Sequence, residues 1–151
     1  MTASFAIAHA DDLPQLVELL GILFTQEHEL SPDSVKQLAG LRLIVGNPAV
    51  GRIYVAREGA RLLGTVSILR TVSTAEGGPA GTLEDFVVRP ECRGRGIGAG
   101  LLAYAVGCAK SDGLLRLLLL TDGDNVHAQR LYERAGFVRS TMLPMRLKLG
   151  L

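Results

Sequence analysis

Apolar residues in the first third of the chain recur at the three- and four-residue spacing that is typical of amphipathic helices. After a short apolar strand at residues 5–8, this spacing predicts a helix that starts at Leu13 and ends near residues 27–29. A second helix is predicted from residues 31–33 until the Gly-Asn-Pro sequence at 46–48. Two helices therefore precede most of the predicted sheet.

The middle of the chain changes to a strand pattern. Residues 52–56 and 62–69 are rich in β-formers, and the Gly-containing turn at 57–60 has the length of a hairpin connection, which predicts an antiparallel pair. Residues 71–81 are rich in Gly, Ser and Thr and are expected to form a loop or a long, ragged hairpin connection. Residues 83–88 are the next predicted strand.

A continuous apolar run at residues 114–120 favours a strand that is covered on both faces. The helix predicted to end near Lys110 would supply the crossover that a parallel pair requires, so this run is expected to lie parallel to residues 83–88. Beyond it, helical spacing at 126–135 ends at Gly136.

The alternation of apolar and polar residues at the C-terminal end predicts two last strands, at 137–138 and 142–149. With no repeat or linker between these elements, the pattern predicts one α+β domain with a mixed sheet over residues 1–151.

Composition narrows the possible partners. The chain has 151 residues and a formal net charge of +1, so no overall field would attract nucleic acid or an acidic membrane surface. The start of the chain lacks the basic segment of a signal peptide, and the longest apolar run is too short to span a bilayer. Two cysteines make no disulfide framework. We therefore expect a cytoplasmic protein without membrane or nucleic-acid partners.

The segment that links the strand at 83–88 to the following helix has the composition of an anion site. Gly94, Gly96 and Gly98 would leave backbone N–H groups uncovered at a helix N-terminus, where the helix dipole favours negative charge. Arg93 and Arg95 add positive charge to the same loop. This arrangement suits a pyrophosphate.

Two other phosphate motifs are excluded by context. The glycines fit a relaxed dinucleotide fingerprint, but that fingerprint belongs at the first strand of a βαβ unit, with an acidic residue about 20 positions later. Here the loop lies past the middle of the chain, and the region around Arg116 is basic and apolar. A Walker loop is excluded because no Gly-Lys-Ser/Thr sequence follows.

No metal site is predicted. The acidic residues at 122–133 resemble a calcium loop in spacing, but His127 stands where that loop requires glycine. The three histidines, His9, His28 and His127, are isolated in sequence. Cys92 has no histidine near it, which leaves a route through an acylated cysteine as a minor alternative.

Two segments resemble the signatures of the GNAT superfamily, the Gcn5-related N-acetyltransferases. Residues 93–98, Arg-Gly-Arg-Gly-Ile-Gly, match its [Q/R]-x-x-G-x-[G/A] motif, and residues 125–137 are similar to its second signature, with Asn125 and Tyr132 in place. The order of elements over residues 5–149 also resembles the GNAT fold. More locally, residues 83–86, Leu-Glu-Asp-Phe, resemble a segment found in spermidine/spermine acetyltransferases.

The resemblance implies a mostly antiparallel mixed sheet with a central, splayed parallel strand pair and about four flanking helices. It implies acetyl transfer from acetyl-CoA to an amine, by direct attack in a ternary complex. The residues that it assigns to cofactor binding are Phe86, Val87, Val88, Arg93, Gly94, Arg95, Gly96, Ile97, Gly98, Ala99 and Asn125.

For catalysis, the resemblance makes Tyr132 the candidate acid, against the alternative of a packed tyrosine with a satisfied hydroxyl. Glu84 is the first candidate for the base and Asp85 the second, with a water chain or another residue as the remaining alternative. Because Glu84 and Asp85 are adjacent, a regular strand would point them to opposite faces.

The acceptor is expected to be a small primary amine, such as a polyamine, an amino acid or an aminoalkyl compound. Its pocket is expected to draw on residues 24–33, 73–82 and 142–143, with Glu27 and Glu29 as candidates for recognising a cation. A protein or peptide acceptor, and a module that binds acetyl-CoA without turnover, are the alternatives. The resemblance also makes a homodimer an expectation.

Overall fold

The computed structural model describes residues 2–27 and 29–150, and these residues contain a five-stranded sheet and four α-helices. The strands are β1 (Ser4–Ile7), β2 (Gly51–Glu58), β3 (Arg61–Ser73), β4 (Gly78–Val88) and β5 (Leu117–Leu119). The helices are α1 (Leu13–Gln26), α2 (Ser34–Ile44), α3 (Ile97–Ser111) and α4 (Val126–Arg134), with short 3-10 turns η1 (Ala10–Asp12) and η2 (Pro90–Cys92).

The strand order is β1-β2-β3-β4-β5, and every neighbouring pair is antiparallel except β4 and β5, which run parallel. The predicted α+β class and mixed sheet are confirmed. In the described part of the chain, no helix has the length and apolar character needed to cross a membrane.

The chain divides into two compact units, Met1–Leu119 and Leu120–Leu151. The first contains the sheet with α1, α2 and α3, and the second contains α4 and an extended C-terminal segment. The prediction of one domain over the whole chain stays a prediction.

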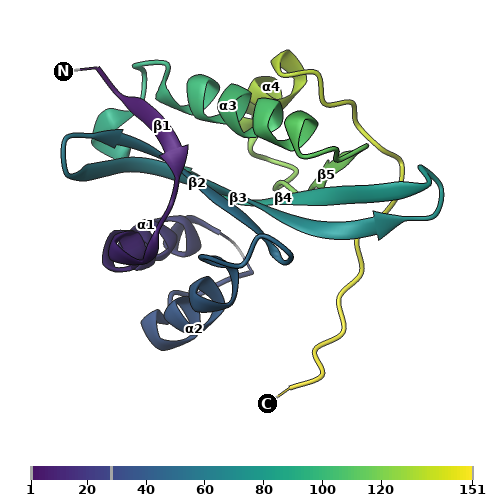
Figure 1. Ribbon diagram of the computed structural model, residues 1–151, viewed down its shortest axis with the longest axis horizontal. Coiled ribbons are helices and arrows are strands. Elements are labelled where there is room, and N and C mark those ends of the chain that lie inside the picture. The colour runs from purple at the N-terminus through teal and green to yellow at the C-terminus, as the bar shows by residue number, and fades with distance from the viewer. Residues whose placement is uncertain (1, 28, 151) are drawn as a thin grey trace. The chain divides into compact units, whose positions relative to one another are not determined.

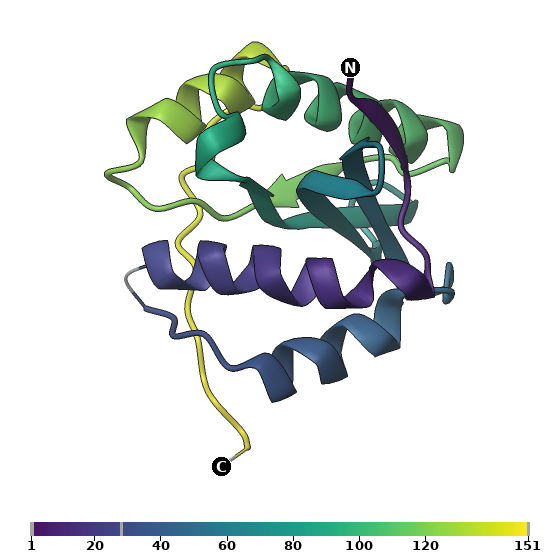
Figure 2. The same cartoon turned by 90° about the vertical axis from the view of Figure 1, so that its left-hand side faces the viewer.

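Within the first unit, helices cover both faces of the sheet. α1 and α2 lie against one face and α3 lies against the other (Figures 1 and 2). The core between α1, α2 and the sheet consists of buried apolar side chains: Ala8, Leu16, Leu19, Leu20, Leu41, Ile53, Val55, Leu62 and Val87. Because both faces are covered, the inner strands are buried on both sides, and β3 is almost continuously apolar from Leu62 to Ile68.

α3 packs on the sheet through aromatic side chains. The Tyr104 ring lies 6.0 Å from the ring of Phe5 and 5.9 Å from that of Tyr54, measured between centroids. Gly100 allows this close approach, since a Cβ there would lie 2.6 Å from Cζ of Phe5. Burial raises the pKa of the Tyr54 hydroxyl to about 12.

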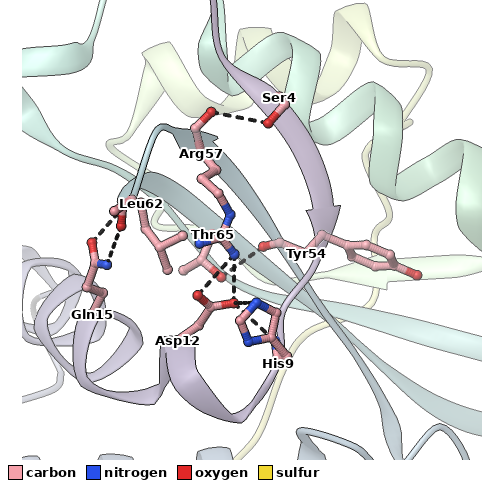
Figure 3. A network of polar contacts seen from close by, with 9 residues as sticks. Ser4, His9, Asp12, Gln15, Tyr54, Arg57, Leu62 and Thr65 are labelled. Carbon is pink, nitrogen blue, oxygen red and sulfur yellow. Dashed lines mark hydrogen bonds and ion pairs between the residues drawn. The ribbon is translucent and has the colours of Figure 1, made fainter.

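A polar network joins the start of α1 to β2 (Figure 3). Asp12 is buried and accepts hydrogen bonds of 3.0 and 2.8 Å from Arg57 Nη2, together with one of 3.0 Å from the backbone N–H of His9. Burial alone raises the pKa of Asp12, but the hydrogen bonds from Arg57 and His9 and the charge of Arg57 outweigh it and lower the pKa. The ion pair therefore fixes where α1 begins relative to the sheet.

Of the two alternatives predicted for residues 71–81, the loop is wrong and the hairpin connection is present, with a shorter turn than predicted. β3 and β4 continue through this segment with Ser73 opposite Gly78, so that only the residues between them turn. Backbone pairing along two long strands here overrides the low strand propensity of the Gly- and Ser-rich sequence.

At the end of the chain, the predicted strands at 137–138 and 142–149 are absent from the described residues. A strand needs a partner for its backbone groups, and the C-terminal segment pairs with no strand in the part of the chain that the structure describes. Its apolar side chains are exposed: Val138 by 90%, Met145 by 96% and Leu149 by 92%. β5 is also shorter than predicted, since only Leu117–Leu119 of the run at 114–120 is paired.

Candidate active site

The parallel pair of β4 and β5, which is not central but lies at one edge of the sheet in the described residues, separates partway along its length. β5 pairs with β4 only at Gly81, Thr82 and Leu83. β4 continues through residues 84–88, whose backbone on this side has no strand neighbour among the described residues. Their other side still pairs with β3, where Val87 lies opposite Thr65 and Val88 opposite Gly64. The predicted splay after a parallel start is therefore present in the sheet.

β4 is irregular at the point where it leaves β5. The register with β3 shifts between Thr65 and Ser67, because Thr65 pairs with Val87 while Ser67 pairs with Glu84. Asp85 has φ of +54°, a left-handed conformation that non-glycine residues seldom adopt. A bulge of this kind redirects side chains and interrupts the alternation of faces. The opposite orientation that a regular strand predicts for Glu84 and Asp85 therefore does not apply here.

The two adjacent carboxylates have different surroundings. Burial raises the pKa of Asp85 to about 6, with smaller contributions from the negative charges of Glu84 and Glu27. The Glu84 residue is exposed as a whole, yet protein atoms displace part of the water around its carboxylate and raise its pKa. Asp85 is thus the carboxylate whose titration lies closer to neutral pH.

The far end of β4 is held by a buried arginine. Arg89 is 6% exposed, donates from Nε to the carbonyl of Leu62 at 2.6 Å, and forms an ion pair with Glu18 of α1. These contacts fix the residues that follow the bulge against both β3 and α1. The loop that leads to α3 begins immediately after this anchor.

That loop has the backbone geometry of an anion site. Gly94 and Gly96 have φ of +80° and +76°, and Gly96 is the N-cap of α3. The first backbone hydrogen bond of the helix runs from the N–H of Gly100 to the carbonyl of Gly96 at 3.0 Å. The N–H groups of residues 97–99 therefore precede the helical hydrogen-bond ladder and can bind an anion.

Both loop arginines also contact the protein. Arg93 donates to the carbonyl of Val88 at 3.2 Å and to the Gln26 side chain at 3.3 Å. Arg95 forms an ion pair of 2.7 Å with Glu58 at the end of β2. Glu58 was not among the predicted site residues and no motif marks it, whereas Gln26 lies in the segment 24–33 that was predicted to contribute to the acceptor pocket. The arginines therefore position the loop as well as adding charge to it.

Asn125 and Tyr132 lie in the second unit. The Asn125 side chain caps α4 by accepting a hydrogen bond of 3.1 Å from the N–H of Ala128. Tyr132 is 9% exposed, and its ring lies edge-on to that of Phe137 with centroids 5.9 Å apart. Gly136 has φ of +103°, which confirms it as the residue that ends the helix. The second signature thus forms a locally well-defined capped helix.

The two glutamates predicted to recognise a cation lie at and beyond the end of α1. Glu27 is the C-cap of α1, and its negative charge contributes to the raised pKa of Asp85, whereas Glu29 lies in the following loop. His28 lies outside the described residues. Within the described ranges, no group of three or more His, Cys, Asp and Glu side chains is placed to hold a metal ion.

A sheet that opens at its parallel pair, beside a glycine-rich helix N-terminus, is typical of acyl-CoA-dependent acyltransferases. The chain matches the model of the acetyltransferase (GNAT) family over residues 13–137 and belongs to that family. It is accordingly an N-acetyltransferase that uses acetyl-CoA.

Individual relatives agree with this assignment. The chain is 30% identical over 144 residues to a glucosamine 6-phosphate N-acetyltransferase of Trypanosoma brucei brucei, covering 95% of this chain and 93% of the relative. A solved Trypanosoma brucei acetyltransferase is 28% identical with a TM-score of 0.74, covering 97% of this chain and 99% of the other. An acetyltransferase from Clostridium acetobutylicum, solved with acetyl-CoA, shares the fold at 19% identity and a TM-score of 0.79, with 99% and 96% covered.

Proposed function

We propose that this protein transfers the acetyl group of acetyl-CoA to the primary amine of a small molecule, by direct attack within a ternary complex. The observation that carries the proposal is the position of Asp85. This carboxylate has a pKa raised to about 6 and lies in a bulge at the point where β4 departs from β5. A base of this strength beside an open strand edge suits the deprotonation of an ammonium group.

The cofactor is assigned to β4 and the loop that follows it. The free backbone edge at Phe86, Val87 and Val88 can pair with the amides of the pantetheine arm as another strand would. The N–H groups of the loop from Arg93 to Ala99 are assigned to the pyrophosphate, which also suits the positive φ of Gly94 and Gly96. Asn125 is assigned to the cofactor by its place in the second signature.

Asp85 is the preferred base, and Glu84 is the second candidate. A base is most effective when its pKa lies near the working pH, and the pKa of Asp85 is closer to that range. Asp85 accepts the ammonium proton, directly or through water, and leaves a neutral nitrogen. Bound acetyl-CoA would supply an activated thioester, to whose carbonyl carbon this nitrogen bonds as the carbon–sulfur bond breaks. The nitrogen then loses its second proton to solvent, which leaves a neutral amide.

Tyr132 is the proposed acid, which protonates the departing sulfur. The assignment rests on the second signature and on the burial of Tyr132 to 9% exposure. A buried hydroxyl of this kind is held in one orientation by its packing.

The acceptor is proposed to be a small molecule because the full-length relative is a glucosamine 6-phosphate N-acetyltransferase and covers nearly the whole of this chain. The negative charges of Glu84 and Glu27 both act on Asp85, and the combined charge of the three carboxylates favours a cationic amine. An amino-sugar phosphate, a polyamine and an aminoalkyl compound are therefore the first acceptors to test.

Thiol release from acetyl-CoA should be measured with glucosamine 6-phosphate, spermidine, ethanolamine, several amino acids and a lysine-containing peptide. We expect release that depends on at least one small amine and exceeds release with the peptide. Tyr132→Phe is expected to lower kcat by about 10²-fold or more. Binding of acetyl-CoA, measured by calorimetry, should stay within about twofold in that variant.

Acetyl-CoA binding without release on any acceptor would contradict the transfer reaction and favour the binding module. Release with the peptide alone would contradict the small-molecule acceptor. Full turnover by Tyr132→Phe across the pH range would contradict only the assignment of Tyr132 as the acid. It would not contradict the proposed transfer reaction.

A further inference from the structure

A cavity of about 470 Å³ lies on the face of the sheet that α3 covers. The residues that line it come from β1, β2 and α3, which all belong to the first unit. On α3 they run from Ala103 to Asp112, whereas the proposed phosphate site uses the N–H groups of residues 97–99. A helix rises about 1.5 Å per residue, so the centres of these two regions lie about 14 Å apart along α3. The cavity is therefore separate from the proposed cofactor site.

The cavity exists because β1 is short and one side of α3 carries small residues. β1 ends at Ile7 while β2 continues past it, so that Arg52 has no β1 residue opposite it. Ala103, Gly107 and Ser111 follow one another at four-residue spacing on α3. A Cβ at Gly107 would meet no atom within 4 Å. The helix therefore leaves the space beyond the end of β1 unfilled.

The lining of the cavity combines an apolar wall with one ion pair. Ile7, Tyr104 and Gly107 are part of the wall. Toward the C-terminal end of α3, Arg52 and Asp112 form an ion pair with 3.2 Å between Nε and Oδ2, and their side chains are 34% and 31% exposed. Arg52 Nη1 and Nη2 and Asp112 Oδ1 make no hydrogen bond to the described residues, so they are available to a ligand.

We propose that this cavity binds an α-amino acid with a large apolar side chain. The carboxylate of the ligand accepts hydrogen bonds from the Nη groups of Arg52, and its ammonium group donates to Oδ1 of Asp112. Its side chain lies against Ile7, Tyr104 and Gly107. Small-molecule sites have volumes of about 300 to 1,000 Å³ and a mostly apolar lining with a few polar groups that fix the orientation of the ligand. The cavity has both properties.

The charges of the ion pair select this class of ligand. An α-amino acid carries its two opposite charges on groups that share one carbon atom, so both charges can reach the two halves of one contact ion pair. Arg52 and Asp112 together are neutral, and a ligand with a single charge would be attracted by one of them and repelled by the other. The site takes no part in the proposed transfer reaction, so its ligand need not be an acceptor.

Calorimetry of the full chain without acetyl-CoA should test the site with L-phenylalanine and L-leucine. We expect saturable binding of one molecule per chain for both amino acids. N-acetyl-L-phenylalanine lacks the ammonium group, L-phenylalaninamide lacks the carboxylate and L-alanine lacks the large side chain, so each should bind at least tenfold more weakly. No binding of either amino acid at up to about 10 mM, or equal binding of the three control compounds, would overturn the proposal.

Substitutions distinguish this site from the acceptor site. Gly107→Leu places a side chain in the open space of the cavity, while Arg52→Gln and Asp112→Asn each remove one charge, and all three should weaken the binding of L-phenylalanine at least tenfold. Lys110→Leu introduces leucine at an exposed position of α3 outside the lining and should leave binding unchanged, as should Asp85→Asn. Full binding by the three cavity variants, or loss of binding in Asp85→Asn, would overturn the proposal.

Cys108 reports directly on the occupancy of the cavity. It is one of the lining residues and is partly exposed, whereas the other cysteine, Cys92, is 2% exposed. A maleimide reagent should label Cys108 at least threefold more slowly in protein that is saturated with L-phenylalanine than in the free protein. An unchanged rate of labelling in the saturated protein would show that the amino acid binds elsewhere, which would also overturn the proposal.

Discussion

At the scale of single residues, Asp85 combines a strained backbone conformation with a negative charge that is unfavourable because it is partly shielded from water. Its φ of +54° and its pKa of about 6 both disfavour the folded state at neutral pH. Features of this kind persist at functional sites when the surrounding structure holds them in place. Here the pairing of β4 with β3 and the anchor at Arg89 do so.

Asp85→Asn should separate activity from stability. Asparagine tolerates the left-handed conformation as well as aspartate does, so the bulge is expected to survive the change. Loss of the base should lower kcat/KM by about 10²-fold or more. In the natural protein, kcat/KM should rise as pH passes the pKa of about 6 and then level off.

The same variant should be more stable at neutral pH. The folded-state pKa of Asp85 lies above its ordinary value, so its stabilising effect is complete below about pH 3.8 and is lost as pH rises through about 6. Removing the charge should raise the free energy of unfolding by about 1 to 3 kcal/mol at pH 7, and by little below pH 4. Glu84→Gln is the matched control, and a larger loss of activity there would make Glu84 the base.

The sequence identified Glu84 and Asp85 as candidates but did not show their surroundings. It predicted a regular strand, in which adjacent side chains alternate between faces. The bulge and the burial of Asp85 depend on how β4 pairs with β3, and the local sequence carries no mark of that register shift. Which carboxylate is the base remains a prediction.

At the scale of elements, the loop before α3 depends on backbone conformation more than on space. A Cβ at Gly96 would meet no atom within 4 Å, but the residue has φ of +76°. Gly107, inside α3, also has open space around its Cα but does not have a positive φ. Comparing substitutions at Gly96 and Gly107 therefore tests the need for the left-handed conformation, because added volume is tolerated at both positions.

Gly96→Ala should raise the Kd for acetyl-CoA at least tenfold and destabilise the fold by about 1 kcal/mol, because it forces a left-handed conformation at the proposed phosphate site. Gly107→Ala should leave Kd unchanged and stabilise the protein by about 0.5 to 1 kcal/mol, because alanine favours a helix. Calorimetry and urea unfolding measure the two quantities. Equal Kd values for both variants would contradict the assignment of the loop to the cofactor.

Elements with strong local signals were predicted well. The periodicity of α1, α2 and α3 and the Gly-rich loop are properties of the sequence itself, and their positions agree with the structure. For the hairpin of β3 and β4, the sequence left a loop as an alternative and did not predict how far the strands are paired, because residues 71–81 have weak strand propensity. Pairing between the two strands stabilises this segment, and the sequence of one segment does not show it.

At the scale of the whole molecule, the sheet predicts a pattern of hydrogen exchange. Amides of β2 and β3, in the interior of the sheet, should be the most protected. Amides at 142–149, which belong to no helix or strand among the described residues, should exchange fastest. Exchange followed by mass spectrometry measures this difference, and equal protection of the two regions would contradict it.

The sequence by itself determined the family, the order of elements up to α4 and the residues able to bind an anion, because periodicity, glycine positions and paired signatures are local. Only the tertiary structure decided where β5 leaves β4, which carboxylate is the less exposed, and which partners hold Arg93 and Arg95. It also showed that the C-terminal segment has no partner strand among the described residues. These features depend on contacts between segments far apart in sequence, and such contacts leave no signal in either segment alone.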